Sequence, residues 1–517
     1  MRLLIAAVLT YIAVSLYVGP SLPGLQFDEA IYEHGAVALM TGDRDLDFGR
    51  EDRSWVNIGG HPIPFMVISY AGAAKFYLLI LPYWIFGTAP VVGRIVSMLL
   101  GALGIFGIGR ALQVQVSDSV GAAVALALAI HPEYVTWVLY DNAGTALWMA
   151  NCGLTALAMS RFASRPSRPS AFFLGFAIGF AIWGRANFLW IIGGIVVGAL
   201  FVFRDFVRRG VRFLPAITAG GIIGSAPLIV FELRTGFSTL RVPASTRPLD
   251  LIPQRLQYVL ESLTFDFERI GIWGGLAVPR WQLYAFGAVV VAPFALLLSL
   301  RASDRPVRLG KLAVIAALIA YGWATATPLG VMPHHYAALL PLPVIAVAMA
   351  ATWLARSGAI GRIVVAAFCV AYATFAITCI RSAHEGLAST RGVGMWSDAI
   401  SDVSNTLLRQ SDGRTVNILD WGLGNNLYVL TRGRVPFQEL FWRADEHVVF
   451  GGIPWSDVVR AGGLFLLNAP NNTHFPQSSA GFQRALAETG AKYSMRSFHQ
   501  ANGAEYARLY DVEPPLH

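Results

Sequence analysis

The chain has 517 residues, of which 55% are hydrophobic and only 14% are charged. Soluble domains are about a quarter charged, so most of this chain is expected to lie in lipid. The net charge of +8 does not indicate a nucleic-acid partner, because the basic residues lie in short loops between apolar runs. The three cysteines show no Cys-x-x-Cys spacing and are interpreted as packing residues, without a disulfide framework.

Eleven membrane-spanning helices are predicted from apolar runs of roughly 20 residues. They cover residues 3–20, 91–110, 119–137, 142–160, 171–186, 187–203, 212–231, 282–300, 310–328, 336–355 and 362–381. No small-residue cleavage site stands between the first run and Asp28, so we expect a retained signal-anchor.

Basic residues gather in alternate loops between these runs. They are Arg161, Arg165 and Arg168; Arg204, Arg208, Arg209 and Arg212; Arg301, Arg305, Arg308 and Lys311; and Arg356 with Arg362. The positive-inside rule places such loops in the cytoplasm. The N-terminus is then cytoplasmic, and residues 21–90, 232–281 and 382–517 lie outside.

The apolar segment 63–86 is interrupted by Pro64, Gly72, Lys75 and Pro82. We interpret it as a helix that lies along the outer interface, anchored by its aromatic residues. The alternative is a genuine span, which would invert every later segment and put the basic loops outside.

The composition becomes more polar after residue 381, and residues 382–517 are predicted to form a small extracytoplasmic α/β domain. Strands are expected at 416–419, 435–440, 464–467, 493–498 and 506–510, with helices at 425–430 and 481–488. The turn Gly422-Leu423-Gly424 lacks the third glycine of a dinucleotide fingerprint. We interpret this domain as a docking or acceptor-positioning unit.

Two adjacent acids, Asp28 and Glu29, follow the first apolar run. A carboxylate close to a membrane is costly unless it is hydrated, paired or used. Asp28 can act as a general base or orient an acceptor, and it can also cap the following helix; the two roles are compatible. Asp141, at the start of the fourth span, has the same two interpretations, because an acid is also favourable at a helix N-terminus.

Arg185 interrupts roughly 30 apolar residues at the turn between the fifth and sixth spans. A guanidinium group there can bind an anionic head group in a bidentate way, or it can extend to lipid phosphates. The run His334-His335-Tyr336 begins the tenth span, and no metal-ligand spacing accompanies it. A phosphate or sugar contact is therefore expected there, and His61 is a weaker candidate for the same role.

These features resemble the GT-C superfamily of polytopic glycosyltransferases, in particular the protein O-mannosyltransferase and lipid A aminoarabinose transferase branch. The resemblance covers residues 20–200 and extends more loosely to about 381. It rests on Phe27-Asp28-Glu29-Ala30, His61-Pro62-Ile63-Pro64-Phe65, Phe86-Gly87, Arg94-Ile95-Val96-Ser97, Pro132 before Asp141, and Gly175 with Gly184-Arg185.

The resemblance implies a GT-C-like transmembrane catalytic domain, residues 1–381, with interfacial helices in the outer loop 21–90. Such enzymes move a sugar from a polyprenyl-phosphate carrier to an acceptor with inversion. The acid pair of the family carries over to Asp28 and Glu29, and the acid of the fourth span to Asp141. The family's Lys-Pro-Pro loop appears here as His61-Pro62-Ile63-Pro64, and its Thr-Lys as Gly184-Arg185. These departures put the carrier and the sugar in doubt.

The predicted catalytic residues are therefore Asp28, Glu29 and Asp141. The residues expected to bind the donor phosphate or substrate are His61, Arg94, Arg185, His334, His335 and Tyr336. The expected partners are a polyprenyl-phosphate sugar, membrane lipids, and a lipid, glycan or protein acceptor. No metal site is predicted, although a divalent cation near Asp28 stays open. The expected location is a bacterial inner (plasma) membrane, with the active site facing the periplasm. The alternatives are a secondary transporter and a membrane scaffold with an extracytoplasmic binding domain.

Overall fold

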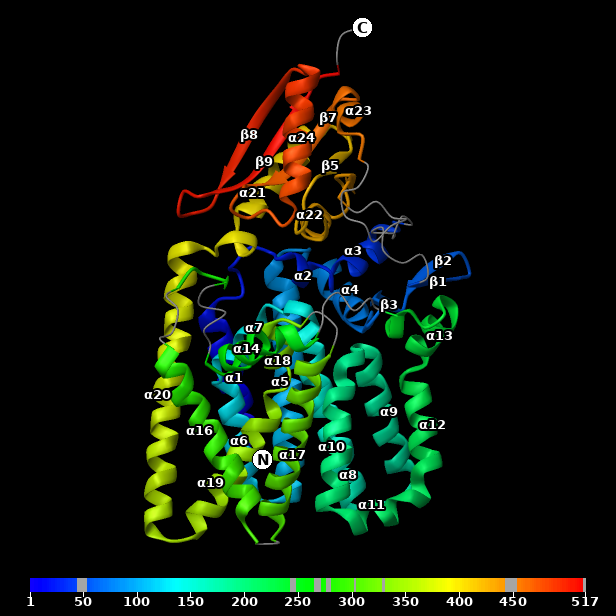
Figure 1. Ribbon diagram of the computed structural model, residues 1–517. Helices are drawn as coiled ribbons and strands as arrows, with labels where there is room; N and C mark the ends of the chain where they lie inside the picture. The colour runs from blue at the N-terminus through cyan, green and yellow to red at the C-terminus, as the bar shows by residue number, and fades with distance from the viewer. Residues whose placement is uncertain are drawn as a thin grey trace.

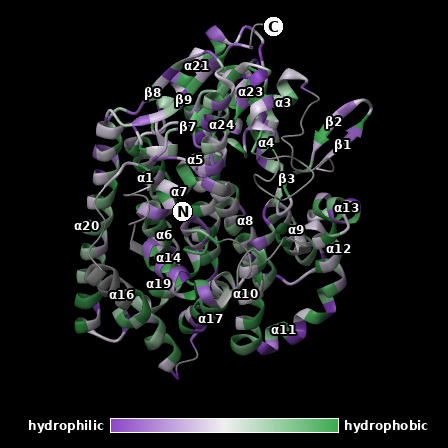
Figure 2. Cartoon of the chain, turned by 45° about the horizontal axis from the view of Figure 1, so that its top comes forward, coloured by the Kyte–Doolittle hydropathy of each residue, from purple (hydrophilic) through white to green (hydrophobic). Residues whose placement is uncertain are grey.

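The computed structural model describes residues 1–43, 54–241, 248–264, 271–275, 280–301, 304–327, 331–441 and 453–514. Most of its helices stand side by side in a bundle, and the C-terminal residues form a sheet-containing unit at one end of that bundle (Figure 1). The bundle helices are mostly apolar, whereas the short helix α11 (Arg204–Gly210) at the opposite end is hydrophilic (Figure 2).

Each predicted span falls on a bundle helix or on a pair of consecutive helices. These are α1 (Arg2–Val18), α5 (Pro90–Gln115), α6 (Asp118–Ala129), α7 (Pro132–Leu139), α8 (Thr145–Ser164), α9 (Arg168–Gly184), α10 (Leu189–Val202), α12 (Leu214–Gly224), α13 (Ala226–Thr235), α16 (Arg280–Ser299), α17 (Arg305–Ala326), α19 (Pro341–Arg356) and α20 (Ala359–Thr390). Short 3-10 turns η1 (Asn142–Gly144), η2 (Ala186–Phe188) and η3 (Val211–Phe213) connect some of them.

Within the described ranges, three helices are long and apolar enough to cross a membrane: α5, α17 and α20. Up to five spans result if each bent pair counts as one, for example α6 with α7, which meet at 62°. Pro132 produces that bend, because its ring cannot continue a helix from the preceding residues. Several other apolar helices, such as α1, α9 and α19, have 17 residues or fewer. The eleven-span topology stays a prediction.

Glycines bring α9 and α12 into backbone contact. A Cβ atom added at Gly175 would lie 1.9 Å from the carbonyl oxygen of Ile217, and one at Gly220 would lie 2.0 Å from that of Phe172. Small residues at such interfaces let helices in lipid approach closely enough for dispersion and weak hydrogen bonds to hold them together. The two helices therefore pack as one unit.

The segment between α1 and α5 contains α2 (Phe27–Ala30), α3 (His34–Thr41) and α4 (Ala74–Phe86), with four short strands before α4. They are β1 (Trp55–Ile58), β2 (His61–Pro64), β3 (Met66–Ile68) and β4 (Ala71–Gly72). The expected interfacial helix over 63–86 is wrong before Ala74. Pro62 and Pro64 favour extended backbone at the residues that precede them, so His61–Pro64 pairs antiparallel with Trp55–Ile58.

Further short elements cover the same end of the bundle. They are η4 (Ser238–Arg241), η5 (Pro248–Leu251), α14 (Ile252–Thr264), α18 (Pro333–Ala337) and η6 (Gly394–Trp396). The buried Arg255 of α14 donates to the carbonyl oxygens of Thr325, at 2.7 Å, and of Thr327. This arginine fixes α14 to the end of α17.

The C-terminal unit is a mixed five-stranded sheet in the order β6-β5-β7-β9-β8. Its elements are α21 (Ala399–Gln410), β5 (Val416–Ile418), α22 (Gly424–Thr431), β6 (Phe437–Glu439), α23 (Trp455–Arg460), β7 (Gly463–Asn468), α24 (Pro476–Thr489), β8 (Tyr493–His499) and β9 (Glu505–Val512). β5 pairs parallel with β6 and β7, and β9 pairs antiparallel with β7 and β8. Helix α20 continues past residue 381, the predicted domain boundary, as far as Thr390.

The C-terminal unit packs directly on the connecting segment of the bundle. The amide nitrogen of Asn426 in α22 donates to the carbonyl oxygen of Leu25 at 3.2 Å, and the Thr88 hydroxyl donates to that of Val429 at 2.9 Å. Tyr428 and Val429 share one apolar cluster with Leu25, Ala30 and Phe76. The sheet is thus positioned directly above α2.

Candidate active site between the bundle and the C-terminal sheet

A buried ion pair fixes the segment that carries the two predicted acids. Glu29 of α2 and Arg94 of α5 are both fully buried, and Nε and one terminal nitrogen of Arg94 donate to the two carboxylate oxygens at 2.7 and 2.8 Å. Arg94 also donates to the carbonyl oxygens of Pro20, Pro23 and Gly24 at 2.8–3.2 Å. All the donors of this guanidinium group are therefore engaged by protein atoms. This arrangement favours a positioning role for Glu29 and Arg94.

A second buried network surrounds Lys75, the charged residue of α4. Its Nζ lies 2.5 Å from a carboxylate oxygen of Asp141 and 3.3 Å from one of Glu33, and all three side chains are at most 1% exposed. The Tyr83 hydroxyl donates to the other oxygen of Glu33 at 2.5 Å. Asp141 also accepts from the backbone N–H of Ala146 at 2.7 Å, so it satisfies one of the free N–H groups in the first turn of α8. Two carboxylates thus share one buried cation.

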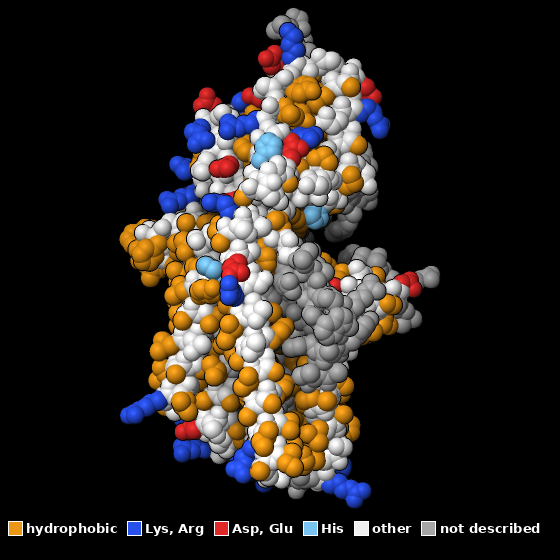
Figure 3. All heavy atoms as spheres, turned by 90° about the vertical axis from the view of Figure 1, so that its left-hand side faces the viewer, with side chains coloured by type: hydrophobic (Ala, Val, Ile, Leu, Met, Phe, Trp, Pro, Cys, Tyr) orange, Lys and Arg blue, Asp and Glu red, His pale blue; other side chains and the backbone are white. Residues whose placement is uncertain are grey.

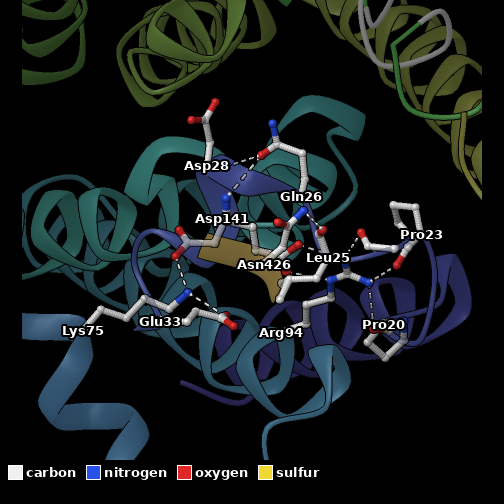
Figure 4. A network of polar contacts seen from close by, with 12 residues as sticks. Pro20, Pro23, Leu25, Gln26, Asp28, Glu33, Lys75, Arg94, Asp141 and Asn426 are labelled. Atoms are coloured by element: carbon white, nitrogen blue, oxygen red, sulfur yellow. Dashed lines mark hydrogen bonds and ion pairs between the residues drawn. The ribbon is translucent and has the colours of Figure 1, made fainter. Parts of the chain in front are cut away.

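Asp28 differs from these acids because its side chain is partly exposed. The Gln26 side-chain oxygen accepts from the backbone N–H groups of Asp28 and Glu29 at 2.5 and 3.3 Å, so Gln26 caps α2 and fixes the backbone at Asp28. The Asp28 carboxyl group points away from the Asp141–Lys75 pair (Figure 4). Of the three predicted acids, Asp28 alone is partly exposed, and Glu29 and Asp141 are fully buried.

Arg185, His334 and His335 are brought together from distant parts of the sequence, and each is at most 8% exposed. Arg185 ends α9 in extended conformation, and its guanidinium carbon lies 5.8 Å from the centre of the Trp148 ring. The rings of His334 and His335 lie 4.2 Å apart, and His334 meets the edge of Trp137 at 5.6 Å. Tyr32 is buried near both this group and the acids: burial and the charges of Asp141 and Asp28 raise its pKa, and the charge of Arg185 lowers it.

The two histidines are neutral in this environment. Burial, reinforced by the nearby charge of Arg185, lowers the pKa of His334 to about 3. Burial and the neighbouring His334 and Arg185 lower the pKa of His335 well below its ordinary value. Nδ1 of His335 lies 3.0 Å from the backbone nitrogen of Met332 and 3.3 Å from its carbonyl oxygen, so the start of α18 fixes the orientation of this ring. Each ring can therefore offer an N–H donor without a charge.

The other predicted binding residues lie elsewhere. His61 is exposed at the start of β2, in the hairpin that projects at the side of the molecule near α13 (Figure 1). Tyr336 is fully buried in the bundle core and stacks on Tyr321 with the ring centres 6.1 Å apart. Its position is that of a packing residue.

Sequence reasoning did not assign roles to Lys75, Glu33 or Gln26. Lys75 gave a signal, because a lysine within an apolar run is expensive in lipid and is rarely without a partner. Its partners could not be identified, because Glu33 and Asp141 are 42 and 66 residues away in the chain. Within the described part of the chain, no three His, Cys, Asp or Glu side chains gather as a metal site would require.

Three solved structures are similar to this chain over nearly all of its length. ArnT from Cupriavidus metallidurans bound to undecaprenyl phosphate gives a TM-score of 0.64 at 13% identity, over 98% of this chain and 97% of ArnT. The apo form of ArnT gives 0.60 at 16% identity, over 97% of each chain. The oligosaccharyltransferase AglB from Archaeoglobus fulgidus, in complex with an inhibitory peptide and a dolichol-phosphate, gives 0.53 at 12% identity, over 98% of this chain and 74% of AglB.

No family model matches the chain, and no curated protein sequence does. The likeness is therefore one of overall architecture, and it extends over nearly all of this chain. These structures show that the chain shares its overall fold with ArnT and AglB.

Proposed function

We propose that this protein is an inverting glycosyltransferase that moves a sugar from a polyprenyl-phosphate carrier to an acceptor on the periplasmic side of a bacterial inner membrane. The observation that carries this proposal is that Asp28, a partly exposed carboxylate on a capped backbone, and Arg185 both act on the buried Tyr32, with His334 and His335 beside Arg185. These are the two chemical requirements of the reaction: a base for the acceptor and a site for the leaving phosphate.

The leaving group requires stabilisation of the negative charge that develops on phosphate. Arg185 can supply a bidentate pair of N–H donors, and His334 and His335 can supply neutral donors beside it. All three are at most 8% exposed, so they act in a medium where electrostatic interactions are stronger than in water. We assign the donor phosphate to this group. Arg94, by contrast, acts on substrate only through the position it gives α2.

The acceptor hydroxyl must lose a proton as it attacks the anomeric carbon. We assign that proton to the Asp28 carboxylate, because Asp28 is partly exposed whereas Glu29 and Asp141 are fully buried in ion pairs with Arg94 and Lys75. Fixed geometry matters as much as the base itself, since misplacing a reactant raises the barrier. The Glu29–Arg94 pair and the Gln26 cap provide that geometry at α2.

The neighbours ArnT and AglB were solved with undecaprenyl phosphate and with a dolichol-phosphate, which supports a polyprenyl-phosphate donor for this fold. The C-terminal unit above α2 supports a role in presenting the acceptor. Trp421 follows β5 and lies against Phe27, with ring centres 4.6 Å apart, so the residue next to Asp28 contacts the sheet. A lipid, glycan or protein acceptor can enter along that boundary.

The decisive experiment compares Asp28→Asn with wild type in sugar transfer from a polyprenyl-phosphate donor. Loss of a positioned base lowers the rate by typically 10²–10⁴-fold. Donor binding should be largely retained, because Arg185, His334 and His335 are unchanged in this variant. The matched control is Asp398→Asn, an acid of the C-terminal unit paired with Arg391. A folded Asp28→Asn protein with wild-type turnover would remove Asp28 from the mechanism.

A transporter is the second candidate, because buried ionisable residues also line transport pathways. Transporters place such residues near the bilayer midplane on broken helices. Here α2, which carries Asp28 and Glu29, lies at one end of the bundle, beneath the C-terminal unit (Figure 1). Uptake of a labelled sugar into vesicles that persists in Asp28→Asn, without any transfer product in wild type, would favour that alternative.

A further inference from the structure

A large apolar cavity lies in the part of the bundle formed by α5, α8, α9, α10, α12, α17 and α19. Its volume is about 870 Å³, within the range of pockets that bind small molecules. Its walls include Leu112, Met159, Leu174, Ile191, Leu312 and Ile345. None of the residues assigned to sugar transfer is among its lining. The cavity is therefore separate from the candidate site for sugar transfer.

Charged residues border this cavity at one end only. They are Arg209 and Asp205 of α11, and Arg305 and Arg308 of α17. Arg308 donates to the carbonyl oxygen of Val202 at 2.7 Å and lies over the Phe203 ring at 4.4 Å, while Arg305 donates to the Gln115 side chain. Three guanidinium groups against one carboxylate give this mouth a positive potential. A molecule with an apolar body and an anionic end would match the apolar walls and the positively charged mouth.

The mouth lies at the end of the bundle opposite Asp28. Helix α11 and the start of α17 are at the lower end in Figure 1, and Lys and Arg side chains gather at that end in Figure 3. A polyprenyl phosphate held by Arg185 has its phosphate at the other end, and so it does not use these arginines. The anionic occupant must come from the membrane leaflet that faces the arginine-rich loops.

We propose that this cavity is a binding site for one anionic glycerophospholipid of that leaflet. Its acyl chains fill the cavity, and its phosphate pairs with Arg209, Arg305 and Arg308. Charge complementarity selects the head group, because anionic lipids are attracted to basic residues at a membrane surface. The bound lipid contacts α9 and α12 on one side of the cavity and α10 and α17 on the other. This site is independent of the assignment of Asp28 and Arg185.

The test uses the delipidated full-length protein and native mass spectrometry. Phosphatidylglycerol and phosphatidylcholine with identical acyl chains are titrated separately, and the lipid-bound fraction is measured. One phosphatidylglycerol should bind in preference to phosphatidylcholine. Arg209→Gln and Arg305→Gln should each weaken it by about fivefold. The matched control is Arg208→Gln, because Arg208 is an exposed arginine of the same helix that does not line the cavity.

A second variant tests the cavity itself. Ala156→Phe places a ring in the apolar wall without changing a charge, and it should abolish tight phosphatidylglycerol binding. If this variant does not fold, the exposed arginine variants still decide the question. Equal binding of the two lipids, or equal loss in Arg208→Gln, would overturn the proposal. One-for-one displacement of phosphatidylglycerol by polyprenyl phosphate would do so too, because the cavity would then hold the donor's tail.

Discussion

Lys75 neutralises two buried carboxylates, those of Asp141 and Glu33. It separates the carboxylates of Asp141 and Glu33, which would otherwise face each other without a cation in a dry environment. Removing one partner of a buried ion pair leaves an uncompensated charge, which is more costly than the pair itself is stabilising. The stability of the whole network therefore rests on one ammonium group.

Lys75→Met should destabilise the protein by about 3–5 kcal/mol, because both carboxylates lose their cation. The measurement is the thermal midpoint in detergent. Lys492→Met is the control, since Lys492 is exposed and its loss should change stability by at most about 0.5 kcal/mol. The double variant Lys75→Met/Asp141→Asn should recover part of the loss. Equal midpoints for Lys75→Met and the control would show that the network does not support the fold.

His334 gives the fold a specific dependence on pH. Its folded pKa of about 3 lies below the ordinary value of 6.5, so the unfolded chain binds more protons between these values. The stability from His334 is present above about pH 6.5 and is lost as the pH falls toward 3. The glutamine in His334→Gln does not titrate, so this variant does not lose that stability. As the pH is lowered from 7.5 to 5, its thermal midpoint should therefore rise relative to that of wild type. A difference that stays constant with pH would contradict the burial of a neutral ring.

At the scale of elements, the glycines of α12 differ by the direction in which they face. Gly220 faces the backbone of α9, where a Cβ atom would lie 2.0 Å from the Phe172 carbonyl oxygen. Its neighbour Gly221 has its nearest contact at 3.7 Å. Gly220→Ala should destabilise by about 1–3 kcal/mol through overpacking. Gly221→Ala should be neutral or slightly stabilising, because alanine is the better helix former. Equal thermal midpoints would show that α9 and α12 are less tightly packed.

Local sequence patterns predicted most elements well. The strands expected at 416–419, 464–467 and 493–498 coincide with β5, β7 and β8, because alternating apolar residues and nearby turns define them locally. The prediction of a helix over 63–86 was wrong before Ala74, because the prolines there favour extended backbone in spite of the apolar composition. For the candidate site, the sequence singles out Asp28 and Arg185, whose roles stay predictions, whereas the Lys75 network depends on contacts between distant segments. The neutrality of His334 could not be predicted either, because it results from burial.

At the scale of the whole molecule, the basic loops and the C-terminal unit lie at opposite ends of the bundle (Figures 1 and 3). In a cysteine-free background, Asn502→Cys and Ser357→Cys each place one exposed thiol at one of these ends. An impermeant thiol reagent added to intact cells should label position 502 and spare position 357. Both positions should react after the cells are opened. Labelling of 357 alone in intact cells would reverse the proposed orientation.

The scarcity of lysine makes Lys75 a chemical reporter of the site. The chain contains only three lysines, Lys75, Lys311 and Lys492, and an amine-acylating reagent needs contact with the side-chain nitrogen. Lys75 is 1% exposed and surrounded by two carboxylates, so it should stay unmodified while Lys492 acquires the mass of the label. The mass of the peptide that contains Lys75 therefore reports whether the boundary between bundle and sheet opens during turnover far enough to expose this lysine.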